Sequence, residues 1–291
     1  MNRILRIATG PSALVVVTIA AASASVVRIV LGPGAAYANI FPPPWLGLVA
    51  AAMVVPVIVL RARGSDAASL WWAWGCAVFF FGASGGFILD AFRAFFALTR
   101  IPAGDFGIVD LAGAVSRGID LIAALVVILY AHAITHREAP PAGRKPALLW
   151  LGILFAVPYP LLKMVWWVQG PSAIQNVGFP AGEIVAFGAA AIWIVVLVGL
   201  TRPNGWSWTV VCGGMVGSGA LLSMGALMVF GFVFQAVAPS GAVVYGEGGS
   251  TLLVFGVYGT WLGLGAVMLA ATLTAMETLM NARTASRAVR P

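Results

Sequence analysis

The amino-acid sequence predicts an all-α membrane protein, a polytopic transmembrane helical bundle with about eight spans. Hydrophobic residues make up 61% of the chain and charged residues only 9%, and the mean hydropathy is +1.01. A soluble domain carries roughly 25% charged residues, so this sequence could not cover a surface that faces water. The apolar residues also fall into eight long runs, which use up the chain. We therefore expect one transmembrane domain over residues 1–291.

Short loops with Gly, Pro or charge separate the predicted spans. The first run follows Arg3 and Arg6 and is too long for a signal-peptide core, so it is predicted to be the first span. Pro158 and Pro160 should break the fifth span and open its backbone toward a cavity. The eight runs are residues 11–32, 44–61, 69–98, 107–134, 147–169, 181–201, 207–238 and 251–279.

The basic residues predict the orientation of the chain. With eight spans, loops on one side hold most of the Lys and Arg, whereas the open loops of the other side hold only Arg100. Cytoplasmic loops are the ones enriched in Lys and Arg, so both termini are expected in the cytoplasm and the protein in the plasma (cytoplasmic) membrane. The net charge of +7 then reflects orientation. No basic run with interleaved aromatic residues indicates a nucleic-acid partner.

The sequence also hints at an internal duplication. The third and seventh runs open on Trp72-Ala73-Trp74 and Trp206-Ser207-Trp208, and the first and fifth carry Arg28 and Lys163 at a nearly equal offset. Two halves, residues 1–140 and 145–291, with four spans each would form a parallel repeat about an axis along the membrane normal. Alternatively, the tryptophans are an ordinary interfacial belt.

Ionisable residues within the predicted spans are the most informative feature of the sequence. Each costs roughly 2.5–3.5 kcal/mol to insert, and such residues usually face the bundle interior and mark function. Nearly all of them fall toward the non-cytoplasmic side. They are Arg28, Asp90, Arg93, Asp110, Arg117, Asp120, Lys163 and Glu183. They form either an ion-pair network that joins the helices or a polar cavity that holds a substrate.

Helical spacing predicts which of these charges share a face. In the run 107–134, Asp110, Arg117 and Asp120 lie on one face, where Arg117 can pair with either acid. Asp120 is the acid nearest the middle of the membrane.

In the run 69–98, Asp90 and Arg93 are partners at i and i+3, and Gly82 and Gly86 form a GxxxG pattern that allows close approach of another helix. The short loop between this run and the next predicts antiparallel neighbours, so the two charged stripes should meet.

The fifth and sixth runs add further polar candidates. Tyr159 precedes Lys163 by one helical turn, and Trp166 and Trp167 follow it. Glu183 stands at the start of the sixth run, where the helix dipole favours a carboxylate.

The sequence argues against metal and cofactor chemistry. His132 and His136 lie four residues apart at the end of one helix, which does not suit a bis-histidine haem, and two solvated interfacial histidines are the simpler interpretation. No phosphate-binding loop or DDxxD-type motif occurs. We therefore expect neither metal nor cofactor.

Acids and aromatic residues together suggest carbocation chemistry. A carboxylic acid in an apolar pocket can stay protonated and donate, and aromatic faces stabilise cations. Such a cavity could protonate an olefin or epoxide and guide the resulting carbocation. The aromatic residues of the third run could equally be packing. They are Phe79, Phe80, Phe81, Phe87, Phe92, Phe95 and Phe96.

The run Pro158-Tyr159-Pro160-Leu161-Leu162-Lys163 followed by Trp166-Trp167, together with the size and the intramembrane acids, resembles small membrane proteins of high-GC actinobacteria. Among these are the membrane-integrated terpene cyclases of bacterial indole-terpenoid pathways. The resemblance implies a compact helical bundle that starts cyclisation by protonation with a carboxylic acid, without metal. It extends over the general organisation of the chain and transfers no catalytic residue.

The leading hypothesis is a metal-independent membrane enzyme for a lipophilic substrate, most concretely a terpene cyclase or related isomerase. The candidate proton donors are Asp90, Asp110, Asp120 and Glu183. Two alternatives stay open, a transporter or binding protein for a small or lipidic solute and a structural subunit of a membrane complex. The candidates for tuning the acids or holding the substrate are Arg28, Arg93, Arg117, Tyr159, Lys163, Trp166 and Trp167.

Overall fold

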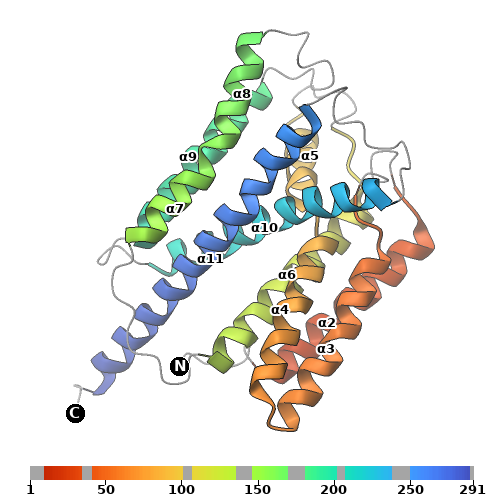
Figure 1. Cartoon of the computed structure of the whole chain (residues 1–291). Helices are drawn as coiled ribbons and strands as arrows, with labels where there is room; N and C mark the ends of the chain where they lie inside the picture. Colours follow the sequence, from red (N-terminus) through yellow and green to blue (C-terminus); the bar gives the residue numbers. More distant parts are fainter. Residues whose placement is uncertain are drawn as a thin grey trace. The chain divides into compact units, whose positions relative to one another are not determined.

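The fold was analysed in a computed structural model of the whole chain (Figure 1). Outside short turns and connections, the residues that the structure describes are helical, and they include no strand. The described residues are 10–34, 41–100, 107–135, 146–169, 181–201, 207–237 and 250–288.

Every predicted apolar run forms helix, which confirms the all-α fold class. Two of the runs are broken into consecutive helices, and the last helix extends beyond its predicted end. The helices are α2 (Pro11–Leu31), α3 (Trp45–Ala62), α4 (Asp66–Ala83), α5 (Phe87–Thr99), α6 (Leu111–Thr135), α7 (Pro146–Ala156), α8 (Pro158–Gln169), α9 (Ala181–Thr201), α10 (Trp208–Val237) and α11 (Ser250–Ala288).

The third run is not one helix, because a turn over residues 84–86 separates α4 from α5. Gly86 has φ 91°, a left-handed conformation that favours glycine. The GxxxG prediction is therefore wrong as a single helical face, since Gly82 belongs to α4 and Gly86 precedes α5. Each glycine nevertheless allows a close approach, Gly82 of the Phe230 ring and Gly86 of the Phe41 ring.

The break predicted in the fifth run is confirmed. Helix α7 ends at Ala156, Val157 forms a bend, and α8 begins at Pro158. Proline disfavours helical backbone at the residue before it and suits the first position of a helix, so the break follows directly from the sequence.

Six helical segments of the described chain are long and apolar enough to cross a membrane, which indicates a membrane protein. Two shorter apolar helices, Pro146–Leu162 and Ala191–Thr201, fall in the fifth and sixth predicted spans. The six segments are Pro11–Leu31, Trp45–Ala62, Asp66–Thr99, Leu111–Thr135, Trp208–Phe230 and Gly259–Met280.

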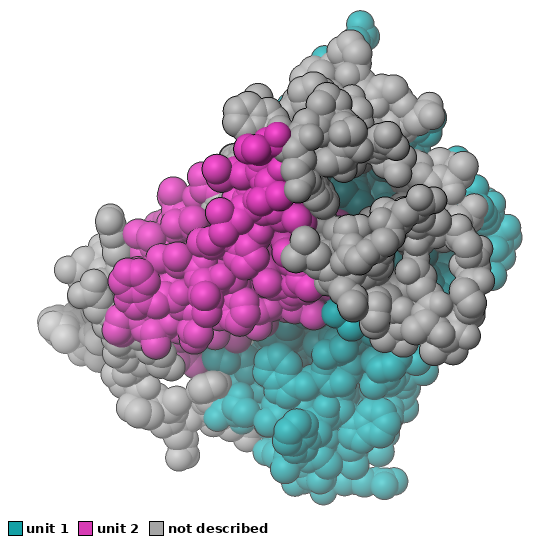
Figure 2. Space-filling model, turned by 45° about the horizontal axis from the view of Figure 1, so that its top comes forward, with its two compact units in different colours: residues 1–140, 226–244 teal, residues 141–225, 245–291 magenta. Residues whose placement is uncertain are grey.

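The chain divides into two compact units, coloured separately in Figure 2. Unit 1 contains residues 1–140 and 226–244, and unit 2 contains residues 141–225 and 245–291. Helix α10 contributes residues to both. The helix breaks do not match between the predicted halves, because α4 and α5 are separate helices whereas α10 is continuous. The internal repeat stays a prediction.

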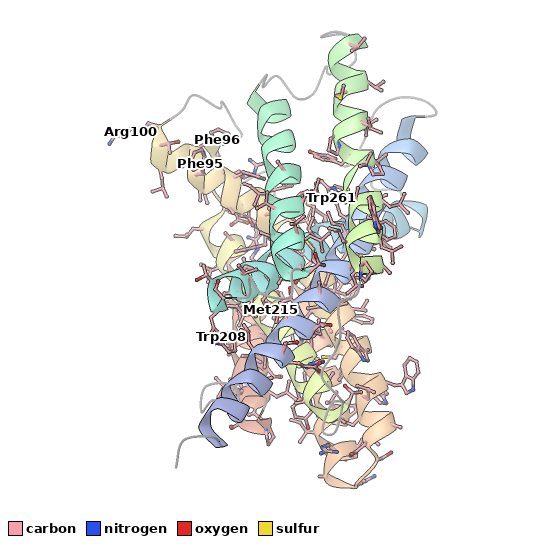
Figure 3. The ribbon with its side chains drawn as sticks, turned by 90° about the vertical axis from the view of Figure 1, so that its left-hand side faces the viewer. Phe95, Phe96, Arg100, Trp208, Met215 and Trp261 are labelled. Carbon is pink, nitrogen blue, oxygen red and sulfur yellow. The ribbon has the colours of Figure 1, made fainter. Side chains whose placement is uncertain are left out.

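In unit 1, four helices close into a ring. Helix α3 packs on α2 and α4, and α6 packs on the same two helices from the other side. The ring encloses a core that includes Leu14, Leu46, Phe80 and Ile128. Helix α5 lies outside this ring and packs on α6. It ends at Thr99 with Arg100 as its C-cap, and the rings of Phe95 and Phe96, labelled in Figure 3, pack edge to face in its last turns.

In unit 2, α7, α9 and α11 pack on one another, and α8 packs on α9 and α11. An aromatic cluster joins three of these helices. The Trp261 ring of α11 lies 4.7 Å from the Tyr159 ring of α8 and 5.9 Å from the Trp193 ring of α9, centroid to centroid, both edge to face (Figure 3). Tyr159 therefore has a packing role in this unit.

Candidate functional site

Among the described residues of unit 1, six charged side chains are buried, all of them candidates from the sequence. They come from α2, α5, α6 and the residue just before α6, and each is less than one-tenth exposed. They are Arg28, Asp90, Arg93, Asp110, Arg117 and Asp120. Which of them are paired decides what chemistry the cluster can perform.

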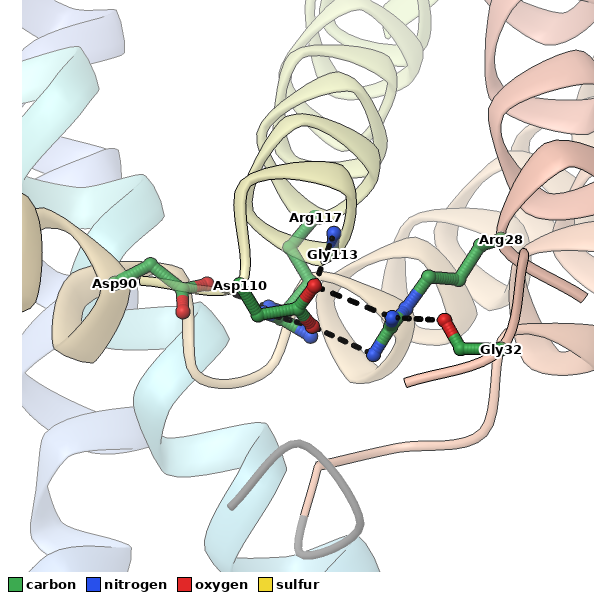
Figure 4. A network of polar contacts seen from close by, with 6 residues as sticks. All are labelled: Arg28, Gly32, Asp90, Asp110, Gly113 and Arg117. Atoms are coloured by element: carbon green, nitrogen blue, oxygen red, sulfur yellow. Dashed lines mark hydrogen bonds and ion pairs between the residues drawn. The ribbon is translucent and has the colours of Figure 1, made fainter. Parts of the chain in front are cut away.

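Asp110 organises the start of α6 (Figure 4). Its Oδ1 accepts a hydrogen bond from the Gly113 backbone N–H at 3.2 Å, and its carbonyl accepts one from Ala114 at 2.8 Å. This is the geometry of an N-cap, in which an Asp side chain satisfies a backbone donor of the first turn. The cap explains why α6 begins at Leu111 and not at the predicted residue 107.

Arg28 joins the end of α2 to the start of α6. Its guanidinium lies 2.7 Å from Asp110 Oδ2 and donates to the Gly32 carbonyl, also at 2.7 Å (Figure 4). A cation at a helix C-terminus and an anion at a helix N-terminus are each stabilised by the helix dipole, typically by 0.3–1 kcal/mol. The Arg28–Asp110 pair uses both effects at once.

Arg117 is the centre of the network. Its Nε donates to Asp90 Oδ2 at 2.6 Å, which ties α5 to α6, and its Nη2 lies 3.7 Å from Asp110 Oδ2. The guanidinium also lies 4.3 Å from the centroid of the Phe41 ring, within cation–π range. The predicted meeting of the two charged stripes is thus confirmed.

The predicted pairing within that stripe is only partly right. Arg117 does contact Asp110, but its closest partner is Asp90 of α5, and no ion pair between Arg117 and Asp120 is seen among the described residues. Arg93 lies one turn beyond Asp90 and is buried too.

Asp120 stands apart from these pairs. It is 3% exposed, and its Oδ1 has no hydrogen-bond partner among the residues that the structure describes. It points at Gly47 of α3, where a methyl group added to the glycine would lie 3.1 and 3.3 Å from the two carboxylate oxygens and closer still to Ser25 Oγ of α2. Three helices of the ring therefore meet at this carboxyl group.

Sequence reasoning missed Ser25, Gly47 and Phe41. Ser25 lies one turn before Arg28 in α2, so helical spacing could have placed it on the same face. Gly47 has no side chain, so no sequence pattern marks it as part of a site. Phe41 is 5% exposed and stands before three consecutive prolines, which lack backbone N–H groups and so suit non-helical chain inside a helical bundle.

The remaining candidates are not joined to this network by any described contact. Tyr159 belongs to unit 2, half-buried against Trp261. The side chains of Lys163, Trp166, Trp167 and Glu183 lie outside the described part of the chain, so their roles stay predictions. The predicted cavity among all four acids is likewise untested.

No protein-family model, curated protein or solved structure matches this chain. The described part of the chain defines a class, a helical membrane protein with a buried ion-pair network and one buried acid outside it.

Proposed function

We propose that this protein is a metal-independent membrane enzyme for a lipophilic substrate, with Asp120 as the proton donor. The most concrete form of the proposal is a terpene cyclase or related isomerase. The proposed setting is the plasma membrane, with eight spans and both termini in the cytoplasm. Alkaline phosphatase fused after Arg100 should be active and fused after Pro140 inactive. The reverse pattern would overturn this topology.

The observation that supports this choice is the contrast among the three buried acids. Asp90 and Asp110 each contact an arginine at 2.6 or 2.7 Å, so both carboxyl groups are engaged in buried ion pairs. Asp120 lacks such a contact within the described part of the chain. An isolated carboxylate is costly in an apolar interior, so we take Asp120 to carry its proton. The four candidate donors predicted from the sequence thereby narrow to Asp120 and Glu183.

The proposed reaction is an isomerisation and conserves atoms. The O–H bond of Asp120 breaks as a C–H bond forms on a substrate alkene, or as an O–H bond forms on an epoxide whose C–O bond opens. Ring closure moves the cation along the substrate, and a C–H bond then breaks to give its proton to the Asp120 carboxylate, which restores the acid. Arg117, three residues before Asp120 in α6, lowers the cost of the transient Asp120 carboxylate.

The test uses the full-length protein in nanodiscs with a polyprenyl indole and its terminal epoxide as probes. Cyclised isomers are detected by chromatography and mass spectrometry, and in D₂O the alkene reaction should add one deuterium. Asp120→Asn should lower the rate by about 10²–10⁴-fold, the usual range for removal of a general acid. Asp66→Asn, an exposed acid of the same unit, is the matched control. Full activity of the folded Asp120→Asn variant would overturn the assignment.

A carrier for a small or lipidic solute is the second candidate. Discontinuous transmembrane helices are typical of transporter binding sites. The breaks at residues 84–86 and at Val157 therefore favour a carrier. Proteoliposomes loaded on one side with a prenyl alcohol separate the two functions. Protein-dependent exchange without product formation would favour the carrier, and product formation would favour the enzyme.

A further inference from the structure

Ser25, Gly47 and Asp120 bring three helices of the ring in unit 1 to one point. Ser25 is fully buried, and its Oγ has no hydrogen-bond partner among the described residues. Asp120 Oδ1 is also buried and likewise has no hydrogen-bond partner among the described residues. The two side chains flank Gly47 from α2 and from α6, and both would contact a methyl group added at that glycine. Two buried oxygens without described hydrogen-bond partners therefore lie beside one glycine.

Buried polar atoms of native proteins are almost always hydrogen-bonded, to protein or to ordered water. A hydroxyl and a carboxyl group that both lack partners would destabilise the bundle, and lipid offers neither of them a donor or acceptor. Internal waters typically fill such positions, provided that the site is polar and large enough. Because Gly47 has no side chain, no methyl group occupies the position that both oxygens face.

We propose that Ser25 and Asp120 bind one water molecule beside Gly47, and that this water is the proton-exchange partner of Asp120. The water accepts the Asp120 O–H proton while it returns one of its own protons to the other carboxyl oxygen, so the charge of the site is unchanged. Ser25 is a positioning residue that holds the water. The use of the exchanged proton on a substrate rests on the proposed function, whereas the water site does not.

The test is infrared spectroscopy of the full-length protein in nanodiscs. The C=O band of protonated Asp120 is the band that Asp120→Asn removes. Ser25→Ala should move this band to higher wavenumber, because the carboxyl group loses a hydrogen-bonded partner, and should slow its H/D exchange by about tenfold, the equivalent of one hydrogen bond. Ser69→Ala is the matched control, since the Ser69 hydroxyl is also fully buried but donates to the Val57 carbonyl at 2.8 Å.

The water site is overturned if Ser25→Ala leaves both the band and the exchange rate unchanged. Gly47→Ala reaches the same position from α3 and should have the same two effects, so the test survives if Ser25→Ala does not fold. A band shift together with full activity of Asp120→Asn would support the water site and overturn the proposed function. If Asp120→Asn is inactive but Ser25→Ala leaves the band unmoved, the proposed function would be supported and the water site overturned. Absence of any band that depends on Asp120 would overturn both.

Discussion

Removing the charge of Asp90 should destabilise the protein far more than removing a comparable surface charge. The Asp90 and Arg117 side chains are 1% and 5% exposed and 2.6 Å apart. Loss of one partner of a buried ion pair costs about 3–5 kcal/mol, because the other charge stays buried without compensation. Asparagine keeps a neutral acceptor for Arg117, and the Phe41 ring still faces the guanidinium. We therefore expect Asp90→Asn to cost about 3 kcal/mol, at the low end of that range.

The matched control is Asp66→Asn, which breaks the ion pair with Arg61 at the start of α4. Asp66 is 49% exposed, and exposed pairs contribute at most about 1 kcal/mol. The free energy of unfolding can be followed by tryptophan fluorescence as detergent-solubilised protein is titrated with SDS. A loss below about 1 kcal/mol for Asp90→Asn, equal to that of the control, would refute the argument from burial.

A double-mutant cycle isolates the pair itself. Asp90→Asn, Arg117→Gln and the double variant should show a coupling energy of about 1–3 kcal/mol, because the two groups are in direct contact. Additive losses would mean that each side chain acts through other partners, such as Asp110 for Arg117.

Three further substitutions test the packing. Gly86→Ala forces a side chain into a left-handed backbone beside the Phe41 ring and should cost more than about 1 kcal/mol in the same SDS titration; a neutral result would contradict the close approach. Trp261→Ala removes the centre of the aromatic cluster and should cost about 3–5 kcal/mol, seen as a lower thermal midpoint, whereas an unchanged midpoint would contradict its burial. Gly152→Ala drives a methyl group into Leu197 and should cost about 1–3 kcal/mol, measured by thermal unfolding with Gly213→Ala, which meets open space, as the control.

Much of the fold could be predicted because hydrophobicity in a membrane is a local signal. The apolar runs located the helices to within a few residues at most ends. The break at Pro158 was also predictable, since proline disrupts a helix by its own chemistry. The break before α5 was not, because glycines are common inside transmembrane helices. Gly86 has a positive φ, and the Phe41 ring occupies the position that a side chain would take, but neither feature is visible in the sequence.

The composition of the site and the meeting of its two charged stripes were predicted, but the Asp90–Arg117 pair was not. Helical spacing correctly placed Arg117 and Asp120 on one helix, with Asp110 at its N-cap, and predicted that the stripe of α5 would meet it. It favoured Asp90 with Arg93, because spacing reports only neighbours on the same helix. The observed Asp90–Arg117 contact depends on how α5 packs on α6, which no local pattern encodes. Helical spacing could place Ser25 on the face of Arg28 but not beside Asp120, because that carboxyl group belongs to another helix.

The Arg28–Asp110 pair also has a consequence for biosynthesis. The two residues are 82 positions apart, so at about 5–20 residues per second the ribosome needs roughly 4–16 s to deliver the acid after the arginine. During this interval α2 must reside in the bilayer with its guanidinium near the headgroups, three residues from the helix end. Once α6 has been inserted, Asp110 can pair with the Arg28 guanidinium. Nascent chains stopped before Asp110 should therefore expose α2 to membrane quality control.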